Sequence, residues 1–259
     1  MSRKPVVVVT GASKGIGLAV TRILLEEFGA HVVTLSRSKS PELLKLTKAH
    51  PAALLAIECD VTDATALSRV IGLAEKTYHN IDGLILNAGV LEPMGKIGDP
   101  SISLDSWKQH FDVNFFSLVT ALRAALPALR RSDLGGRVVF VSSGAAVGNT
   151  AGWGPYNASK AAVNSLCRTF AQEEPDVVSV ALRPGMVDTP MQAQIRESGA
   201  PHLTEQDFTK FSSAYAEGKL VKPEDSGYVI AALALRAPKS LSGQFVSWNS
   251  EDCKDFRRA

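Results

Sequence analysis

The sequence predicts an α/β fold built on a parallel sheet. Short, continuous runs of apolar residues, such as 6–9 and 138–141, alternate along the chain with longer segments of helical periodicity. Such runs are typical of strands that are buried on both faces of a parallel sheet, with helices covering those faces. A glycine-rich loop, 11–17, joins the first run directly to the first helical segment. With 259 residues the chain is long enough for one large domain, and we expect 1–259 to fold as a single unit.

The composition is that of an ordinary globular protein, with 45% hydrophobic and 21% charged residues. The net charge of +2 gives no reason to expect nucleic acid or a membrane as a partner. The cysteines, at 59, 167 and 253, are odd in number and widely spaced, and the five histidines lack ligand spacing. We therefore expect neither a disulfide framework nor a metal site. The first strand follows Met1 almost at once and no apolar run approaches a membrane span, so we expect a cytoplasmic protein.

The first strand is expected at 5–10 and the first helix at 18–28, on either side of the glycine loop. A strand, a glycine loop and a helix in this order form a cradle for the phosphate groups of a dinucleotide. Gly11 permits the tight turn, Gly15 lets the backbone approach the pyrophosphate, and Gly17 lets the helix pack on the strand. The alternative is that the loop is only a turn. The cofactor contacts expected from this loop are Gly11, Ser13, Lys14, Gly15, Ile16 and Gly17.

The second strand is expected at 31–36, and its end should meet the adenosine ribose of the cofactor. Ser36 and Arg37 stand there in place of a carboxylate, and Lys14 lies in the glycine loop. A carboxylate would bind the ribose 2′-hydroxyl and repel a 2′-phosphate, whereas the planar guanidinium of Arg37 suits the phosphate. The sequence therefore predicts NADP(H) rather than NAD(H). The alternative is that Arg37 and Lys14 are ordinary surface cations.

After a helix at 41–50, the next two strands, 52–59 and 81–86, end in residues that can contact the cofactor. Asp60 has two equally good interpretations. It could accept a hydrogen bond from the adenine amino group, or it could cap the helix that starts near Asp63. Small residues at the end of the later strand would let a flat ligand lie close to the backbone. Besides Asp60, the cofactor contacts expected at the ends of these two strands are Val61, after the first strand, and Asn87, Ala88 and Gly89, after the second.

The buried run 138–141 leads to Ser143, and a later helical segment begins with Tyr156 and carries Lys160 four residues on, on the same helix face. A free phenol, with a pKa of about 10, is a poor acid or base at neutral pH. A nearby ammonium lowers the pKa of the phenol, and a second cation, such as an oxidised nicotinamide ring, would lower it further. Ser143 would donate a hydrogen bond to a substrate carbonyl, where negative charge develops.

The same Tyr-x-x-x-Lys spacing recurs at Tyr215 and Lys219. This second pair spans Gly218 and follows no strand, and His202 stands at the upstream position where the first pair has Ser143. We therefore interpret Tyr215 and Lys219 as a solvated helix end.

A long helical pattern at 104–129, interrupted near Pro127, contains the polar residue Asn114 within the apolar stretch FDVNFF. A polar residue in such a place can serve a reaction. It can also cap a kink or make a hydrogen bond in the core.

The remaining elements are a strand at 177–183, a helix that begins at Pro223 and a strand at 244–248. The segment around 187–222 is longer than a plain connection, which predicts a substrate lid. Its apolar residues and those of the loop after the central strand would form a pocket for a bulky aromatic or diketone substrate, or they would only cover the sheet. They are Met186, Met191, Ile195, Phe208, Phe211, Val147 and Trp153.

Together these motifs resemble the short-chain dehydrogenase/reductase family over nearly the whole chain. The motifs are TGASKGIG, NAG, Asn114, Ser143, Tyr156-x-x-x-Lys160 and Arg183-Pro184-Gly185. The resemblance implies a Rossmann-type, doubly wound fold, a seven-stranded parallel sheet with helices on both faces and with cofactor and substrate at its carboxyl edge. It also implies that Tyr156 is the general acid/base, that Ser143 orients the carbonyl, and that Lys160 holds the nicotinamide ribose. Asn114 would join a proton relay through water and, like Tyr156 and Lys160, lie at the cofactor.

The resemblance extends to the nicotinamide side of the site and to the substrate. It places Pro184, Gly185, Val187 and Thr189 around the nicotinamide, and it implies a homodimer, or a tetramer, formed through the helices of Asn114 and Tyr156. The stretches LRPGMVDTPMQ and APKSLSGQFVSW look most like the benzil reductase and sepiapterin reductase-like branch. We therefore expect an NADPH-dependent carbonyl reductase that acts on a small-molecule ketone or vicinal diketone, with a benzil-like aromatic dicarbonyl favoured. The alternatives are an NADP-dependent alcohol dehydrogenase of the same fold and a non-catalytic dinucleotide-binding sensor.

Overall fold

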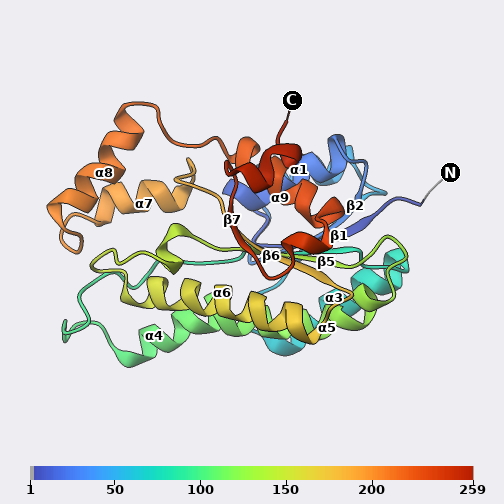
Figure 1. Ribbon diagram of the computed structural model, residues 1–259, viewed down its shortest axis with the longest axis horizontal. Helices are drawn as coiled ribbons and strands as arrows, with labels where there is room; N and C mark the ends of the chain where they lie inside the picture. Colours follow the sequence, from blue (N-terminus) through green and yellow to red (C-terminus); the bar gives the residue numbers. More distant parts are fainter. Residues whose placement is uncertain (1–2, 259) are drawn as a thin grey trace.

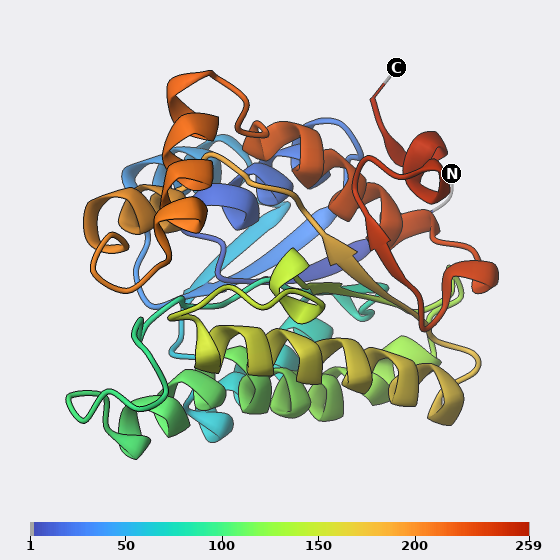
Figure 2. The same cartoon turned by 60° about the vertical axis from the view of Figure 1, so that its left-hand side comes forward.

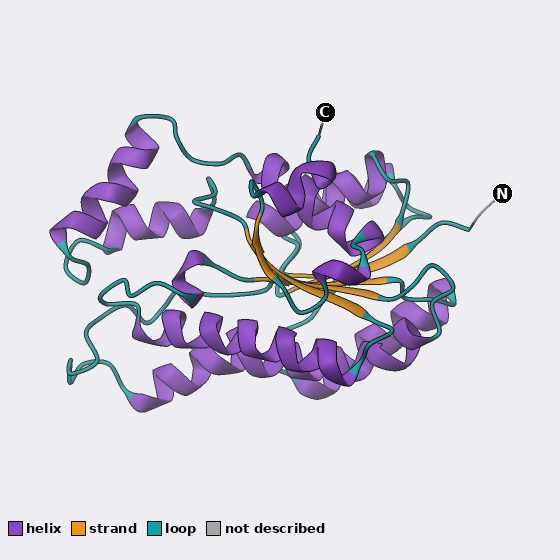
Figure 3. Ribbon diagram, viewed as in Figure 1, coloured by secondary structure: helices purple, strands orange, loops and turns teal. Residues whose placement is uncertain are grey.

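The computed structural model describes residues 3–258 and has a seven-stranded parallel sheet at its centre (Figures 1 and 3). The strands lie in the order β3-β2-β1-β4-β5-β6-β7, and each neighbouring pair is parallel. The order changes direction between β1 and β4, and in such sheets the carboxyl ends of the strands at this point form a crevice for ligands. The predicted fold class is confirmed. The strands are β1 (Val6–Thr10), β2 (His31–Ser36), β3 (Leu54–Glu58), β4 (Gly83–Leu86), β5 (Arg137–Val141), β6 (Val178–Arg183) and β7 (Phe245–Ser247).

Helices cover both faces of the sheet. The helices α1, α2 and α9 pack on one face, and α3, α5 and α6 pack on the other (Figure 1). The helices α7 and α8 lie outside these two layers, at the same end of the molecule as α4 (Figure 2). The helices are α1 (Gly15–Glu26), α2 (Pro41–Ala49), α3 (Ala64–Tyr78), α4 (Leu104–Phe111), α5 (Ser117–Arg130), α6 (Gly154–Glu173), α7 (Pro190–Ser198), α8 (Glu205–Ala216) and α9 (Pro223–Arg236).

The core consists of two apolar layers that the strands separate. Successive side chains of a strand point to opposite faces, so Val7 and Val9 join the layer under α1 and α9, while Val8 joins the layer under α3 and α5. All three are fully buried. This burial on both faces explains why the strands are continuous apolar runs rather than alternating ones.

The helical run from 104 to 130 differs from its prediction in the place of its interruption. Pro127 lies inside α5, and the break is a π-helical turn at Asp112–Phe116, centred on Asn114. A proline removes one backbone donor, but Pro127 is on the exposed face of α5, where water can bind the freed carbonyl. A π turn inserts one extra residue into a helix and is common at functional sites.

The same run, Leu104–Arg130, is a helical segment of 27 residues with an apolar middle. It is long and apolar enough to cross a membrane by length and composition alone. However, 44% of its most apolar stretch is buried inside the molecule, where α5 packs against the sheet and α3. Packing in the core therefore accounts for part of this apolar composition.

A buried ion pair joins the amino ends of β1 and β4, far from the carboxyl ends of the strands. Both carboxylate oxygens of Asp82, which is 3% exposed, accept hydrogen bonds of 2.6 Å from the Arg3 guanidinium. The Ser132 hydroxyl and the Val6 amide donate to the same carboxylate at 2.5 and 2.8 Å. Burial alone would raise the pKa of Asp82, but these four hydrogen bonds hold it below its usual value.

Replacing Asp82 by alanine should lower the free energy of unfolding at pH 7 by about 2–3 kcal/mol, because the Val6 amide and Arg3 lose their partner. A carboxylate whose pKa is depressed by folding stabilises the protein above its unfolded pKa of about 4, and this contribution disappears as the pH falls through the folded value. Urea unfolding of wild type and D82A at pH 7 and pH 3 should therefore show the difference shrinking at pH 3. An equal difference at both pH values would show that the charge is not what stabilises this end of the sheet.

Candidate active site

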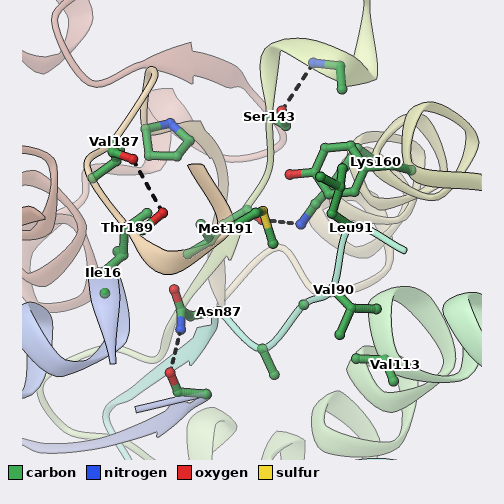
Figure 4. Close-up of a pocket in the computed structure, with 18 of the residues that line it drawn as sticks. Ile16, Asn87, Val90, Leu91, Val113, Ser143, Lys160, Val187, Thr189 and Met191 are labelled. Atoms are coloured by element: carbon green, nitrogen blue, oxygen red, sulfur yellow. Dashed lines mark hydrogen bonds between the residues drawn. The ribbon is translucent and has the colours of Figure 1, made fainter. Parts of the chain in front are cut away.

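A cavity of about 1020 Å³ opens at the carboxyl ends of β1, β4, β5 and β6. It is bordered by the glycine loop on one side and by α7 and α8 on another. Residues predicted from widely separated motifs meet here, and Figure 4 shows several of them facing the same space. The predicted site residues that line the cavity are Gly11, Ser13, Lys14, Gly15, Ile16, Ser36, Arg37, Asp60, Val61, Asn87, Ala88, Gly89, Ser143, Tyr156, Lys160, Pro184, Gly185, Val187 and Thr189. Gly17 and Asn114 are not among the lining residues.

The glycine loop has the geometry of a phosphate cradle. Gly11 and Gly15 have φ values of +69° and +54°, a conformation that other residues adopt only with strain. Gly17 is instead required by close approach, since a Cβ at this position would lie 2.3 Å from the carbonyl oxygen of Gly11. In the described chain, no side chain caps the amino end of α1, and its first turn carries no acidic residue. The amino end of this helix therefore faces the cavity with free amides, and the loop fits the pyrophosphate of a dinucleotide.

Asn87 holds the end of β4 against the glycine loop. Its side-chain amide donates hydrogen bonds to the carbonyl oxygens of Thr10 and Gly11, at 2.9 and 3.0 Å, one of which is drawn in Figure 4. The backbone amides of Asn87 and Ala88 both donate to the Thr10 hydroxyl at 3.0 Å. Asn87 therefore shapes the loop with its side chain, while the backbone from Asn87 to Gly89 borders the cavity.

Two residues of opposite charge lie at the end of the cavity that Ser36 borders. Arg37 follows β2 and is exposed, and Asp60 follows β3. Asp60 does not cap α3, because Asp63 does so by accepting a hydrogen bond from the Ala66 amide. Asp60 instead accepts from the amide and hydroxyl of Thr62. The Thr62 amide, more than the charge of Arg37, holds the pKa of Asp60 below its usual value against the effect of burial.

Ser143, Tyr156 and Lys160 meet on one wall of the cavity. Ser143 ends the segment after β5, and its hydroxyl accepts a hydrogen bond of 3.1 Å from the Ala145 amide (Figure 4). Tyr156 and Lys160 lie one turn apart in α6, and the Lys160 Nζ is 5.7 Å from the centre of the Tyr156 ring. The Lys160 ammonium donates a 2.8 Å hydrogen bond to the Val141 carbonyl, which fixes the side chain beneath the tyrosine.

The electrostatics of Tyr156 differ from the prediction. Burial raises the pKa of Tyr156, and the neighbouring Ser143 hydroxyl only partly opposes this effect. Burial also lowers the pKa of Lys160 to about 8. The pKa of Tyr156 is therefore raised in this structure, against the expected lowering, because removal from water disfavours the charged phenolate. Near pH 7 the phenol keeps its proton, and most of the lysine is charged.

Asn114 lies beneath the cavity floor rather than in it. It is 1% exposed, and its side chain is bonded on both sides to the backbone of Val90. The Val90 amide donates to Asn114 Oδ1, and Asn114 Nδ2 donates to the Val90 carbonyl, both at 2.8 Å. In this structure the contacts of Asn114 are therefore those of a residue that makes hydrogen bonds in the core.

The segment predicted as a lid begins and ends at the same place in the fold. Val187 and Val221 form an isolated parallel bridge, so the chain leaves and returns at one point. Between them lie α7 and α8, outside the two helical layers (Figure 2), and residues of both helices line the cavity. Arg196 of α7 stacks 3.8 Å from the centre of the ring of Tyr215 of α8. Tyr215 is 53% exposed and Lys219 pairs with Glu217 in solvent, as predicted for a solvated helix end.

The apolar part of the cavity contains most of the predicted pocket. Trp153 stacks on Phe211 of α8, with ring centres 5.1 Å apart, and its edge meets the ring of Tyr156 at 5.6 Å. Phe208 does not line the cavity. The predicted residues that do line it are Val147, Trp153, Met186, Met191, Ile195 and Phe211.

Sequence reasoning missed several lining residues. Leu91 directly follows the small residues at the end of β4, so its position in the chain could have indicated it. Gln192, a polar residue in the first turn of α7, is 4% exposed, and in the described chain its Nε2 has no hydrogen-bond partner. His110 does not line the cavity but packs edge-on against the ring of Tyr156, and its one signal in the sequence is its spacing of one helical turn from Asn114.

The comparisons with known proteins agree with this arrangement. A family model described as short chain dehydrogenase matches residues 5–200. An uncharacterized oxidoreductase of Schizosaccharomyces pombe is 43% identical over 95% of this chain and 96% of its own. The benzil reductase ((S)-benzoin forming) IRC24 of Saccharomyces cerevisiae is 36% identical, over 95% of this chain and 96% of its own. The crystal structure of the short chain dehydrogenase/reductase YIR035C from the same yeast matches with a TM-score of 0.93 and 35% identity, over 98% of this chain and 100% of its own. The chain therefore belongs to the short-chain dehydrogenase family, which comprises oxidoreductases that use nicotinamide cofactors.

Proposed function

We propose that this protein is an NADPH-dependent carbonyl reductase that acts on a ketone or a vicinal diketone, with benzil-like aromatic dicarbonyls favoured. The observation that carries the proposal is the meeting of Ser143, Tyr156 and Lys160 on one wall of the cavity that the glycine loop also borders. A proton donor and a phosphate cradle in one cavity are what hydride transfer to a carbonyl requires.

Each of the three residues has a task that its contacts support. The Ser143 hydroxyl would donate a hydrogen bond to the carbonyl oxygen of the substrate and hold it beside Tyr156. The Tyr156 phenol keeps its proton near neutral pH and would give it to that oxygen as negative charge develops. The Lys160 ammonium, 5.7 Å from the ring centre, would then stabilise the tyrosinate. A reduced nicotinamide bound beside these groups would supply the hydride.

The shape of the cavity supports an aromatic substrate. Trp153 and Phe211 form a stacked pair next to Tyr156, and Met186 and Met191 add flexible apolar surface. The relative IRC24 is named as a benzil reductase, a protein that acts on an aromatic diketone. We infer that the segment 187–222 is the substrate lid, since its two ends meet at the bridge between Val187 and Val221.

The cofactor preference rests on Arg37 and Lys14. Both are exposed cations at the end of the cavity bordered by Ser36, where the adenosine ribose would lie. In the same region Asp60 would accept a hydrogen bond from the adenine amino group, because its role as a helix cap is taken by Asp63.

Replacing Arg37 by aspartate should shift the preference from NADPH toward NADH. The substitution removes the guanidinium that would bind the 2′-phosphate and adds a carboxylate that repels it and can bind a 2′-hydroxyl. We expect the ratio of kcat/KM for NADPH to that for NADH to fall by about 100-fold, corresponding to about 3 kcal/mol. Steady-state kinetics with both cofactors would measure this ratio, with Arg22→Asp on the exposed side of α1 as the control. An unchanged ratio in R37D would remove the argument for NADP(H).

The proposed activity is tested by following the loss of NADPH absorbance with a panel of diketones, ketones and aldehydes. We expect the highest kcat/KM with aromatic vicinal diketones. A faster reaction of alcohols with NADP⁺ would favour the alcohol dehydrogenase, and tight cofactor binding without turnover of any substrate would favour the sensor.

Family members often form oligomers, and we infer a homodimer for this chain. Leu104 and Phe116, which are 69% and 54% exposed, lie at the start of α4 and in the π turn, on the helical run that the family resemblance places at an interface. Light scattering would give the mass of the particle in solution.

A further inference from the structure

His110 is a buried imidazole beneath the reactive wall of the cavity. It is 1% exposed and lies in the last turn of α4. Its Nδ1 is 2.6 Å from the carbonyl oxygen of Glu92, and its Nε2 is 2.8 Å from Asn114 Nδ2. Its ring meets the Tyr156 ring edge-on, with centres 6.2 Å apart. Both ring nitrogens therefore have partners, and one partner is the predicted site residue Asn114.

The protons of this cluster can be assigned from the backbone of Val90. Because the Val90 amide can only donate, the Asn114 atom that it contacts must be oxygen, and the Asn114 atom that contacts the Val90 carbonyl must be nitrogen. The same Asn114 nitrogen faces His110 Nε2, so Nε2 must accept and Nδ1 must carry the proton that it donates to Glu92. Burial lowers the pKa of His110, and the charge of Lys160 acts in the same direction, so the imidazole is neutral as this assignment requires.

The cluster joins three segments that border the cavity. His110 belongs to α4, and Glu92 and Val90 belong to the segment after β4, which lines the cavity through Val90 and Leu91 (Figure 4). The third segment is α6, because the Ser159 hydroxyl lies 3.0 Å from His110 Nε2 and donates a hydrogen bond of 3.0 Å to the Tyr156 carbonyl oxygen. Ser159 directly precedes Lys160.

The segment after β4 lies directly on this cluster. A Cβ at Gly89 would be 3.4 Å from Asn114 Oδ1 and 3.8 Å from Lys160 Nζ. A change in the orientation of the Asn114 amide would therefore move the backbone of Gly89 and Val90 relative to Lys160. On its remaining side that amide contacts His110 Nε2 at 2.8 Å and, more weakly, the Ser159 hydroxyl oxygen at 3.5 Å.

We propose that His110 is a positioning residue, which locks the Asn114 amide and thereby fixes the segment from Gly89 to Glu92 against Lys160 and Tyr156. An apolar side chain at this position would fill the space but would leave one N–H of Asn114 and the Glu92 carbonyl without their partner. The inference uses the proposed function only for its kinetic readout.

The first test compares His110→Phe, which keeps a ring without nitrogen atoms, with His110→Gln, whose amide can donate to Glu92 and accept from Asn114. A misplacement of about 1 Å near a reacting centre can cost about 100-fold in rate, so we expect H110F to lower kcat by about 10- to 100-fold. We also expect H110F to weaken NADPH binding about fivefold, measured by fluorescence titration, and H110Q to restore most of both losses. His31→Phe, at the far end of β2, is the matched control and should change only the thermal midpoint.

The second test is a double-mutant cycle with Asn114→Ala, using the dissociation constant of NADPH. If His110 acts through Asn114, H110F should add almost nothing to the effect of N114A. The ¹⁵N shifts of His110 in the cofactor-free protein should show protonated Nδ1 and bare Nε2, a readout that needs neither cofactor nor substrate. Equal losses in H110F and H110Q, effects that multiply with those of N114A, or a proton on Nε2 would each overturn the proposal. Absence of turnover in the wild type would instead count against the proposed function, since the shifts and the cycle would still report on His110.

Discussion

Replacing Tyr156 by phenylalanine is expected to lower kcat for carbonyl reduction by about 10²- to 10⁴-fold, the range typical for the loss of a general acid. The substitution removes only the hydroxyl, and the ring keeps its edge contacts with Trp153 and His110. The dissociation constant of NADPH should stay within about twofold of the wild-type value, because the glycine loop and the adenosine end of the cavity are unchanged. Steady-state rates and a fluorescence titration of NADPH measure the two quantities.

The chain offers a matched control in the second Tyr-x-x-x-Lys pair. Tyr215→Phe removes the same hydroxyl from a tyrosine that is 53% exposed at the end of α8. Its kcat should equal that of the wild type. Equal rates for Y156F and the wild type would show that another group or water supplies the proton, and the proposed mechanism would fail.

Replacing Gly17 by alanine is expected to weaken NADPH binding by about 10- to 100-fold, in line with the 1–3 kcal/mol that overpacking usually costs. The added methyl group would lie 2.3 Å from the Gly11 carbonyl oxygen and 2.6 Å from Asn87 Nδ2. A backbone carbonyl within a tight turn cannot move aside, so the amino end of α1 must retreat from the loop that it completes. The thermal midpoint should fall as well, because α1 packs against α9 and β1.

Gly72→Ala is the control for this substitution. Gly72 lies inside α3, and among residues 3–258 no atom beyond its chain neighbours and its own helix backbone comes within 4 Å of the position that its Cβ would take. Alanine is the better helix former by about 1 kcal/mol, so G72A should raise the thermal midpoint and leave the NADPH affinity unchanged. If G17A bound NADPH as tightly as G72A, the close packing of helix on loop would not be what forms the cofactor site.

Most of the fold could be predicted from local sequence because its signals are local. The run Val6–Val9 is apolar since both faces of β1 are covered, and Gly11 and Gly15 mark positive φ values that only glycine adopts without strain. The ends of elements were predicted less accurately. The strands predicted to begin at 52 and 81 begin at Leu54 and Gly83, because the ladder of hydrogen bonds with the neighbouring strands sets these limits.

What depended on distant residues could not be predicted. The break at Asn114 rather than at Pro127 depends on Val90, which Asn114 binds across 24 positions of the chain. The cap of α3 is by contrast a local contact, in which Asp63 accepts a hydrogen bond from the Ala66 amide three residues on, and Asp60 is left at the edge of the cavity. The raised pKa of Tyr156 follows from the amount of protein that covers it, a quantity that no spacing along the chain encodes.

The sequence by itself determined the order of strands and helices along the chain, the glycine turn and the types of reactive side chain. Each of these depends on the conformational limits or the chemistry of residues that are neighbours in sequence. Only the tertiary structure decided which of these side chains face the cavity and how they ionise. It placed Asn114 and His110 beneath the cavity and buried Tyr156 in the cavity wall. Burial and hydrogen-bond partners are set by segments that meet only when the sheet is assembled.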